Sequence, residues 1–165
     1  MKPALLVIDV QKQFFTGNPV MTQSLNDAVQ YINAAIALFR EKGLPVISVQ
    51  HVDQAEKLVP GEAGFDLPDE LAVRPSDLHI HKTYGNAFNK TPLGDELRAL
   101  GVDTVIITGF CAEECVLSSY RGAEDADLVP IILRGSLASG SLENIKFVES
   151  ISALISYGAL KKMLA

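Results

Sequence analysis

The sequence predicts an α/β protein, a three-layer α/β/α sandwich in which helices cover both faces of a doubly wound, mostly parallel sheet of about six strands. One reason is that apolar runs typical of buried parallel strands alternate along the chain with segments of helical spacing. A second is the strand, helix, strand order, which implies parallel neighbours joined by right-handed crossovers. The 165 residues fit a single domain over residues 1–165, and such sheets bind ligands beyond the carboxyl ends of their strands.

The first elements follow from the N-terminal pattern. A continuous apolar run at residues 4–8 ends in Asp9, which is typical of a strand that is buried on both faces. A helix is predicted next, because apolar residues repeat with helical spacing after Ser24 and Asp27, which resemble a capping pair. Residues 45–50 form a second apolar run and predict the second strand.

A stretch from Gln54 to Pro75 contains glycine and proline and is long for a connection. Loops of this kind are often functional, so we expect it to cover the binding site. Residues 78–81 predict a third strand, Thr91 and Pro92 begin a helix with a cap and a proline at its first position, and residues 102–108 predict a fourth strand.

The last third of the chain continues the alternation. Residues 112–123 are helical in type, and residues 128–133 predict a fifth strand. A closing helix is expected over residues 141–157, and a sixth strand over residues 159–163.

The net charge and the apolar pattern of the chain limit the kinds of partner that we expect. The net charge of -6 and the scattered Lys and Arg residues disfavour nucleic acid, because phosphate binding needs clustered positive charge. The N-terminal apolar run is too short for a signal segment or a membrane span, so we expect a cytoplasmic protein without a membrane partner. The two cysteines, Cys111 and Cys115, are expected to be free thiols in that reducing compartment.

Three residues near strand ends are candidates for chemistry. Cys115 lies near the start of a helix, where backbone amides and the helix dipole favour a thiolate, although buried cysteines are often only small hydrophobes. Asp9 is a carboxylate that is costly to bury unless it pairs or acts as an acid or base, and it is otherwise a helix cap. Lys82 can lower the pKa of a thiol, although most lysines are simply solvated.

Three segments of the chain, residues 6–11, 82–93 and 108–116, resemble the signature segments of the isochorismatase-like cysteine hydrolases. They read Leu-Val-Ile-Asp-Val-Gln, Lys-Thr-Tyr-Gly-Asn-Ala-Phe-Asn-Lys-Thr-Pro-Leu and Thr-Gly-Phe-Cys-Ala-Glu-Glu-Cys-Val. The resemblance covers about residues 4–133 and implies a Rossmann-like topology. It also implies a catalytic triad of Cys115, Asp9 and Lys82.

The same resemblance implies a reaction. A cis peptide between Phe110 and Cys111 would direct the amides of Cys111 and Cys115 into an oxyanion hole. Cys115 would then cleave the C–N bond of a small amide or carbamoyl compound through a thioester, without a cofactor. Six residues near the strand ends are predicted to line the substrate pocket, with ordinary core packing as the alternative: Gln11, Phe14, His51, Tyr84, Phe88 and Phe110.

Departures from the family pattern bear on metal binding and on reactivity. Nicotinamidases of this family hold a divalent ion with an Asp-x-His pair, whereas this chain has the order His51, Val52, Asp53, so we predict no metal. Glu113 and Glu114 stand where many members carry Asn, Asp or a neutral residue. An acid close to the nucleophile would raise its pKa, and the alternative is that the two acids only favour the start of the helix.

Other functions stay open. A vinyl ether hydrolase of the isochorismatase type needs a proton donor but no thiol. A hydrolase-like protein that binds a partner, or that senses oxidants through Cys115, would use the same fold without turnover. Members of the family are commonly homo-oligomers, and we expect the same here.

Overall fold

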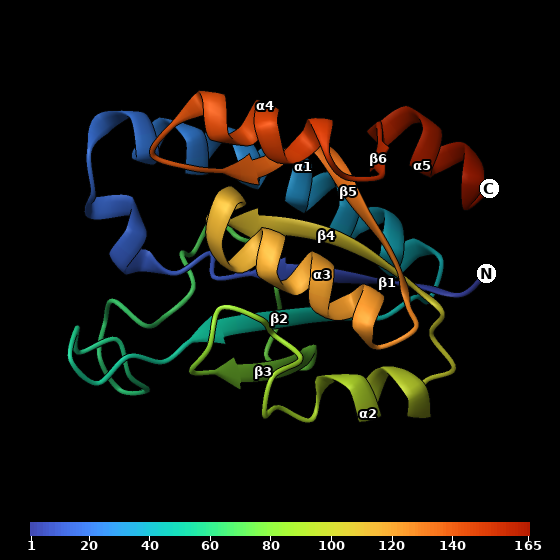
Figure 1. The fold of residues 1–165 in the computed structure, drawn as a ribbon, viewed down its shortest axis with the longest axis horizontal. Coiled ribbons are helices and arrows are strands. Elements are labelled where there is room, and N and C mark those ends of the chain that lie inside the picture. The colour runs from blue at the N-terminus through green and yellow to red at the C-terminus, as the bar shows by residue number, and fades with distance from the viewer.

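A computed structural model describes residues 1–165 and contains one six-stranded sheet with the order β3-β2-β1-β4-β5-β6 (Figure 1). All neighbouring strands are parallel, which confirms the predicted α/β sandwich. The elements in chain order are β1 (Pro3–Ile8), η1 (Lys12–Thr16), α1 (Pro19–Glu41), β2 (Val46–His51), β3 (Leu78–Lys82), α2 (Leu93–Ala99), β4 (Thr104–Phe110), η2 (Ala112–Val116), α3 (Leu117–Asp125), β5 (Val129–Ala138), α4 (Leu142–Ser150), β6 (Leu154–Ile155) and α5 (Tyr157–Met163).

The sheet separates two apolar cores. Strand β1 is buried along its whole length, with Leu6 and Ile8 facing one core and Leu5 and Val7 the other. Helices α2, α3 and α4 cover the first core, and α1 and α5 cover the second. Alternate side chains of one strand therefore serve both layers, as expected of a parallel sheet that is covered on both faces.

Helix α1 begins earlier than the sequence analysis places it. The Oδ1 atom of Asn18 caps it by accepting the Met21 N–H at 2.8 Å, and Pro19 occupies the first turn. The predicted cap at Ser24 and Asp27 is wrong, because Ser24 is buried inside the helix and its Oγ accepts the N–H of Ser139 at 3.1 Å.

None of the five α-helices is long and apolar enough to cross a membrane.

The C-terminal elements also differ from the prediction. Helix α4 ends at Ser150, and the sixth strand is the short β6 at residues 154–155. Residues 159–163 are helical, because the Ser156 Oγ caps α5 by accepting the Ala159 N–H at 3.3 Å. Leu160 then lies fully buried in the core under α1.

Strand β5 continues to Ala138, beyond its predicted end at residue 133. Ile107 of β4 pairs with Ile132, whereas Gly109 pairs with Leu137, so the extra residues of β5 form a bulge. Gly135 lies in this bulge with a φ of 86°. The bulge carries the end of β5 up to the same sheet edge as the end of β4.

The crossovers after β1 and β4 leave toward opposite faces, so the point where strand order reverses lies between these two strands. Gly109 allows their carboxyl ends to approach closely. A Cβ atom at this position would lie 2.1 Å from the carbonyl oxygen of Ile8, and its φ of 117° is one that L-residues rarely adopt.

We therefore expect Gly109→Ala to lower the free energy of unfolding by about 3 kcal/mol or more, since it combines backbone strain with a backbone clash. Chemical denaturation followed by circular dichroism measures this change. The matched control is Gly158→Ala in α5, where a Cβ atom meets nothing within 4 Å and the helix gains stability. Equal stabilities for the two variants would contradict the close approach of β1 and β4.

Candidate active site

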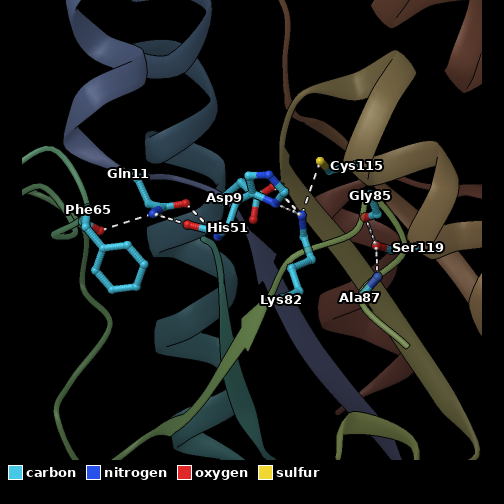
Figure 2. A network of polar contacts seen from close by, with 9 residues as sticks. All are labelled: Asp9, Gln11, His51, Phe65, Lys82, Gly85, Ala87, Cys115 and Ser119. Atoms are coloured by element: carbon cyan, nitrogen blue, oxygen red, sulfur yellow. Dashed lines mark hydrogen bonds and ion pairs between the residues drawn. The ribbon is translucent and has the colours of Figure 1, made fainter. Parts of the chain in front are cut away.

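Three polar side chains from different strand ends meet at the carboxyl edge of the sheet (Figure 2). Asp9 directly follows β1, Lys82 is the last residue of β3, and Cys115 lies in the turn after β4. The Nζ of Lys82 lies 2.9 Å from the Oδ2 of Asp9 and 3.2 Å from the Sγ of Cys115. Because β3 lies two positions from β1 in the sheet, the long side chain of Lys82 makes these contacts possible.

The ion pair between Asp9 and Lys82 is fully enclosed. The exposed fractions of the two side chains are 2% and 0%. Asp9 has a positive φ of 52°, so the chain turns sharply where β1 ends. The Oδ1 of Asp9 is buried and has no hydrogen-bond partner.

The nucleophile candidate stands in an irregular helical turn. Residues 112–116 form a π-helical turn, in which Val116 donates its N–H to the carbonyl of Cys111 at 3.1 Å, and α3 continues from it. Such turns are rare and are frequently found at functional sites. The peptide bond between Phe110 and Cys111, at the entrance to the turn, is cis.

The electrostatics of the site differ from the sequence expectation of a stabilised thiolate. Burial, and next the Asp9 carboxylate, raise the pKa of Cys115 to about 12, although Lys82 acts in the opposite direction. Burial also raises the pKa of Asp9, and Lys82 again opposes the shift. Burial thus favours the protonated form of both acids, and the positive charge of Lys82 opposes this for each of them.

His51, the last residue of β2, completes the group around Lys82. Its Nδ1 lies 3.0 Å from the Nζ of Lys82. Asp9, His51 and Cys115 offer potential metal ligand atoms within 4.8 Å of one another, but the ammonium of Lys82 contacts all three residues. The three side chains thus serve as hydrogen-bond acceptors of the Lys82 ammonium, which leaves little room for a metal cation beside it.

The other predicted pocket residues have separate surroundings. The ring centroids of Phe14 and Phe110 are 4.7 Å apart, and Phe110 is the first residue of the cis peptide. Tyr84 is 43% exposed, and its hydroxyl accepts a hydrogen bond from Lys90 at 3.1 Å. Phe88 packs against the core that α2 and α3 cover. The role of these residues toward a substrate stays a prediction.

Gln11 is fully buried and binds the backbone of two segments. Its Nε2 donates to the carbonyls of His51 at 3.1 Å and Phe65 at 3.2 Å, and its Oε1 accepts the N–H of His51 at 2.8 Å. Gln50, which the sequence analysis did not single out, also donates to the Phe65 carbonyl, at 2.9 Å. The loop of residues 54–75 is thereby attached to the ends of β1 and β2.

Glu113 is directed toward β5 and α4. Its Oε1 accepts hydrogen bonds from the Ser139 hydroxyl at 2.9 Å and the Asn144 amide at 2.7 Å, two residues that sequence reasoning missed. Burial, and next Glu113, raise the pKa of Cys111 to about 12, whereas the acid that raises the pKa of Cys115 is Asp9. The two thiols pack against different cores on opposite faces of the sheet.

Comparison with known proteins identifies the family of the chain. The family model of the isochorismatase domain matches residues 3–149. YecD, an isochorismatase family protein of Escherichia coli O157:H7, is 30% identical over 156 residues, which cover 85% of this chain and 81% of YecD. Maleamate amidohydrolase of Pseudomonas putida is 27% identical over 150 residues, 81% of this chain and 70% of that enzyme. The crystal structure of N-carbamoylsarcosine amidase from Thermoplasma acidophilum matches with a TM-score of 0.81 and 25% identity, over 94% of this chain and 96% of that one. The chain belongs to the isochorismatase family of hydrolases.

Proposed function

We propose that the chain hydrolyses the C–N bond of a small amide or carbamoyl compound, with Cys115 as the nucleophile, and releases ammonia or an amine. The observation that carries this proposal is the buried contact of one ammonium, that of Lys82, with both Asp9 and Cys115. Two similar proteins, maleamate amidohydrolase and N-carbamoylsarcosine amidase, are named for reactions of the same class.

In the first step the thiol of Cys115 attacks the carbonyl carbon of the substrate. The Oδ1 of Asp9, which is buried without a hydrogen-bond partner, takes the thiol proton as the C–S bond forms. The carbonyl oxygen becomes negative and is stabilised by the backbone amides of Cys111 and Cys115. Lys82 stabilises the negative charge while it lies on the sulfur.

In the second step the C–N bond breaks and a thioester forms on Cys115. Asp9 returns its proton to the leaving nitrogen, and its raised pKa suits a carboxyl group that must hold a proton and then release it. A water molecule, deprotonated by Asp9, then attacks the thioester. The acid product leaves, and the sulfur recovers its proton.

This sequence of steps explains why the resting thiol need not be ionised. Transfer of the proton from Cys115 to Asp9 leaves the total charge of the two acids unchanged, so Lys82 balances them before and after the transfer. A raised thiol pKa also disfavours a role in oxidant sensing, because the thiolate is the form that reacts with oxidants. The contact of Cys115 with Lys82 favours a thiol mechanism over vinyl ether hydrolysis.

Cys115→Ala is expected to lower ammonia release from the amides that the wild type hydrolyses by at least about a thousandfold, because the nucleophile is lost. The measurement is a coupled ammonia assay over a panel of small amides and carbamoyl compounds. The exposed Ser150→Ala variant is the control and should match the wild type. Undiminished turnover in the Cys115 variant would contradict the thiol mechanism. Labelling of Cys115 by an electrophile without turnover of any amide would indicate a binding or sensing protein instead.

Removal of the negative charge of Asp9 and removal of the positive charge of Lys82 should move the pKa of Cys115 in opposite directions. Asp9→Asn removes the carboxylate that raises this pKa, so the thiol should ionise at lower pH, whereas Lys82→Met should shift ionisation to higher pH. Thiolate absorbance against pH, with the Cys115→Ala spectrum subtracted, measures both shifts.

Both variants should nevertheless lose amide turnover, because Asp9 is the proposed base and Lys82 stabilises the attacking sulfur. The exposed Asp125→Asn variant should leave the titration of Cys115 unmoved. If Asp9→Asn made the thiol harder to ionise, the assignment of Asp9 as its electrostatic partner would be wrong.

A further inference from the structure

We infer that His51 is a positioning residue, whose unprotonated Nδ1 is the third hydrogen-bond acceptor of the Lys82 ammonium and holds it between Asp9 and Cys115. The catalytic meaning of this inference depends on the proposed function, whereas the contact itself does not. Figure 2 shows the imidazole ring of His51 directed at the end of the Lys82 side chain.

The hydrogen-bond inventory of Lys82 supports this role. An ammonium group has three N–H donors and no acceptor. Its Nζ has three polar neighbours: the Oδ2 of Asp9 at 2.9 Å, the Nδ1 of His51 at 3.0 Å and the Sγ of Cys115 at 3.2 Å. Each N–H thus has one acceptor. The side chain of Lys82 is completely buried, so a lost acceptor would leave one N–H unpaired away from water.

The contact also determines the tautomer of His51. Because the ammonium can only donate, Nδ1 must be the acceptor, and the neutral ring carries its proton on Nε2. A proton on Nδ1 would place a second positive charge beside Lys82. Burial and the charge of Lys82 lower the pKa of His51, while Asp9 and Asp53 act in the opposite direction, which agrees with a neutral ring.

The backbone of His51 is held on both sides. In the sheet it pairs in register with Lys82 itself, and the carbonyl of Lys82 accepts the N–H of Val52 at 2.7 Å. On the other side, the side chain of Gln11 binds both the N–H and the carbonyl of His51. The backbone that carries the ring is therefore held in place, and a series of contacts connects Gln11 through His51 to Lys82.

Loss of the acceptor should release the ammonium from its position beside the sulfur. Its third N–H would turn toward Asp9, the remaining strong acceptor, and the ammonium would stabilise the attacking sulfur less. We expect slower chemistry with little change in KM, because the function of His51 is exerted through Lys82 and not through the substrate.

The test compares His51→Asn with His51→Leu, two side chains of similar size. The Oδ1 of Asn can accept a hydrogen bond near the place of Nδ1, whereas Leu cannot. The first readout is the rate at which iodoacetamide alkylates Cys115, which requires no amide substrate. The second is the kcat and KM of ammonia release, and thermal unfolding verifies that both variants are folded. His79→Leu, outside this network, is the matched control.

We expect the Leu variant to be alkylated about tenfold more slowly than the wild type, and the Asn variant to stay within about threefold of it. The kcat should follow the same order, with KM nearly unchanged. Equal alkylation rates for wild type and Leu variant would overturn the inference, as would equal impairment of the Asn and Leu variants. A raised KM with normal alkylation would assign His51 to substrate binding instead. If no amide is hydrolysed even by the wild type, the proposed function fails, but the alkylation contrast still decides the role of His51.

Discussion

The ion pair between Asp9 and Lys82 is the constraint on which the rest of the site depends. Both side chains are removed from water, and a buried ion pair is tolerated only where further hydrogen bonds compensate the loss of hydration. The parallel sheet makes the pair possible, because it places the ends of β1 and β3 at the same edge. His51 and Cys115 then complete the surroundings of the ammonium.

This constraint also accounts for the protonation of the nucleophile. A permanent thiolate at position 115 would share one ammonium with a carboxylate, which leaves a net negative charge in an apolar interior. A protonated thiol at Cys115 avoids that charge. The site consequently stays close to neutral during proton transfer, and the fixed dipoles and charges around it need little rearrangement.

Much of the fold could be predicted because buried parallel strands leave a clear pattern in the chain. The strands at residues 45–50, 78–81 and 102–108 were each predicted to within two residues of their ends. Two errors lie where a helix cap decides the outcome, and a third lies at the end of β5, which a bulge extends to Ala138. Asn18 starts α1 before the apolar repeat is visible, and Ser156 caps a helix over the residues that were predicted as the sixth strand.

The site was harder to predict than the fold, because strand order and burial depend on the packing of the whole chain and not on the sequence of one segment. The distance from Lys82 to Cys115 depends on how β3 and β4 are placed across the sheet. The helix-start argument for a thiolate at Cys115 omitted both burial and the neighbouring Asp9. The sequence left two roles open for Glu113, an effect on the pKa of Cys115 or a contribution to the helix start, and the structure shows its hydrogen bonds to Ser139 and Asn144.

The attachment of the loop over residues 54–75 has a consequence for how the family can diversify. Gln11 and Gln50 bind this loop through the carbonyl oxygen of Phe65, a group that every amino acid possesses. Side chains along the loop can therefore change in evolution while the path of its main chain at this point is kept. The buried side chains of Leu58, Phe65 and Leu71 remain fixed points of the loop, so selection for new substrates can act mainly on the exposed positions between them.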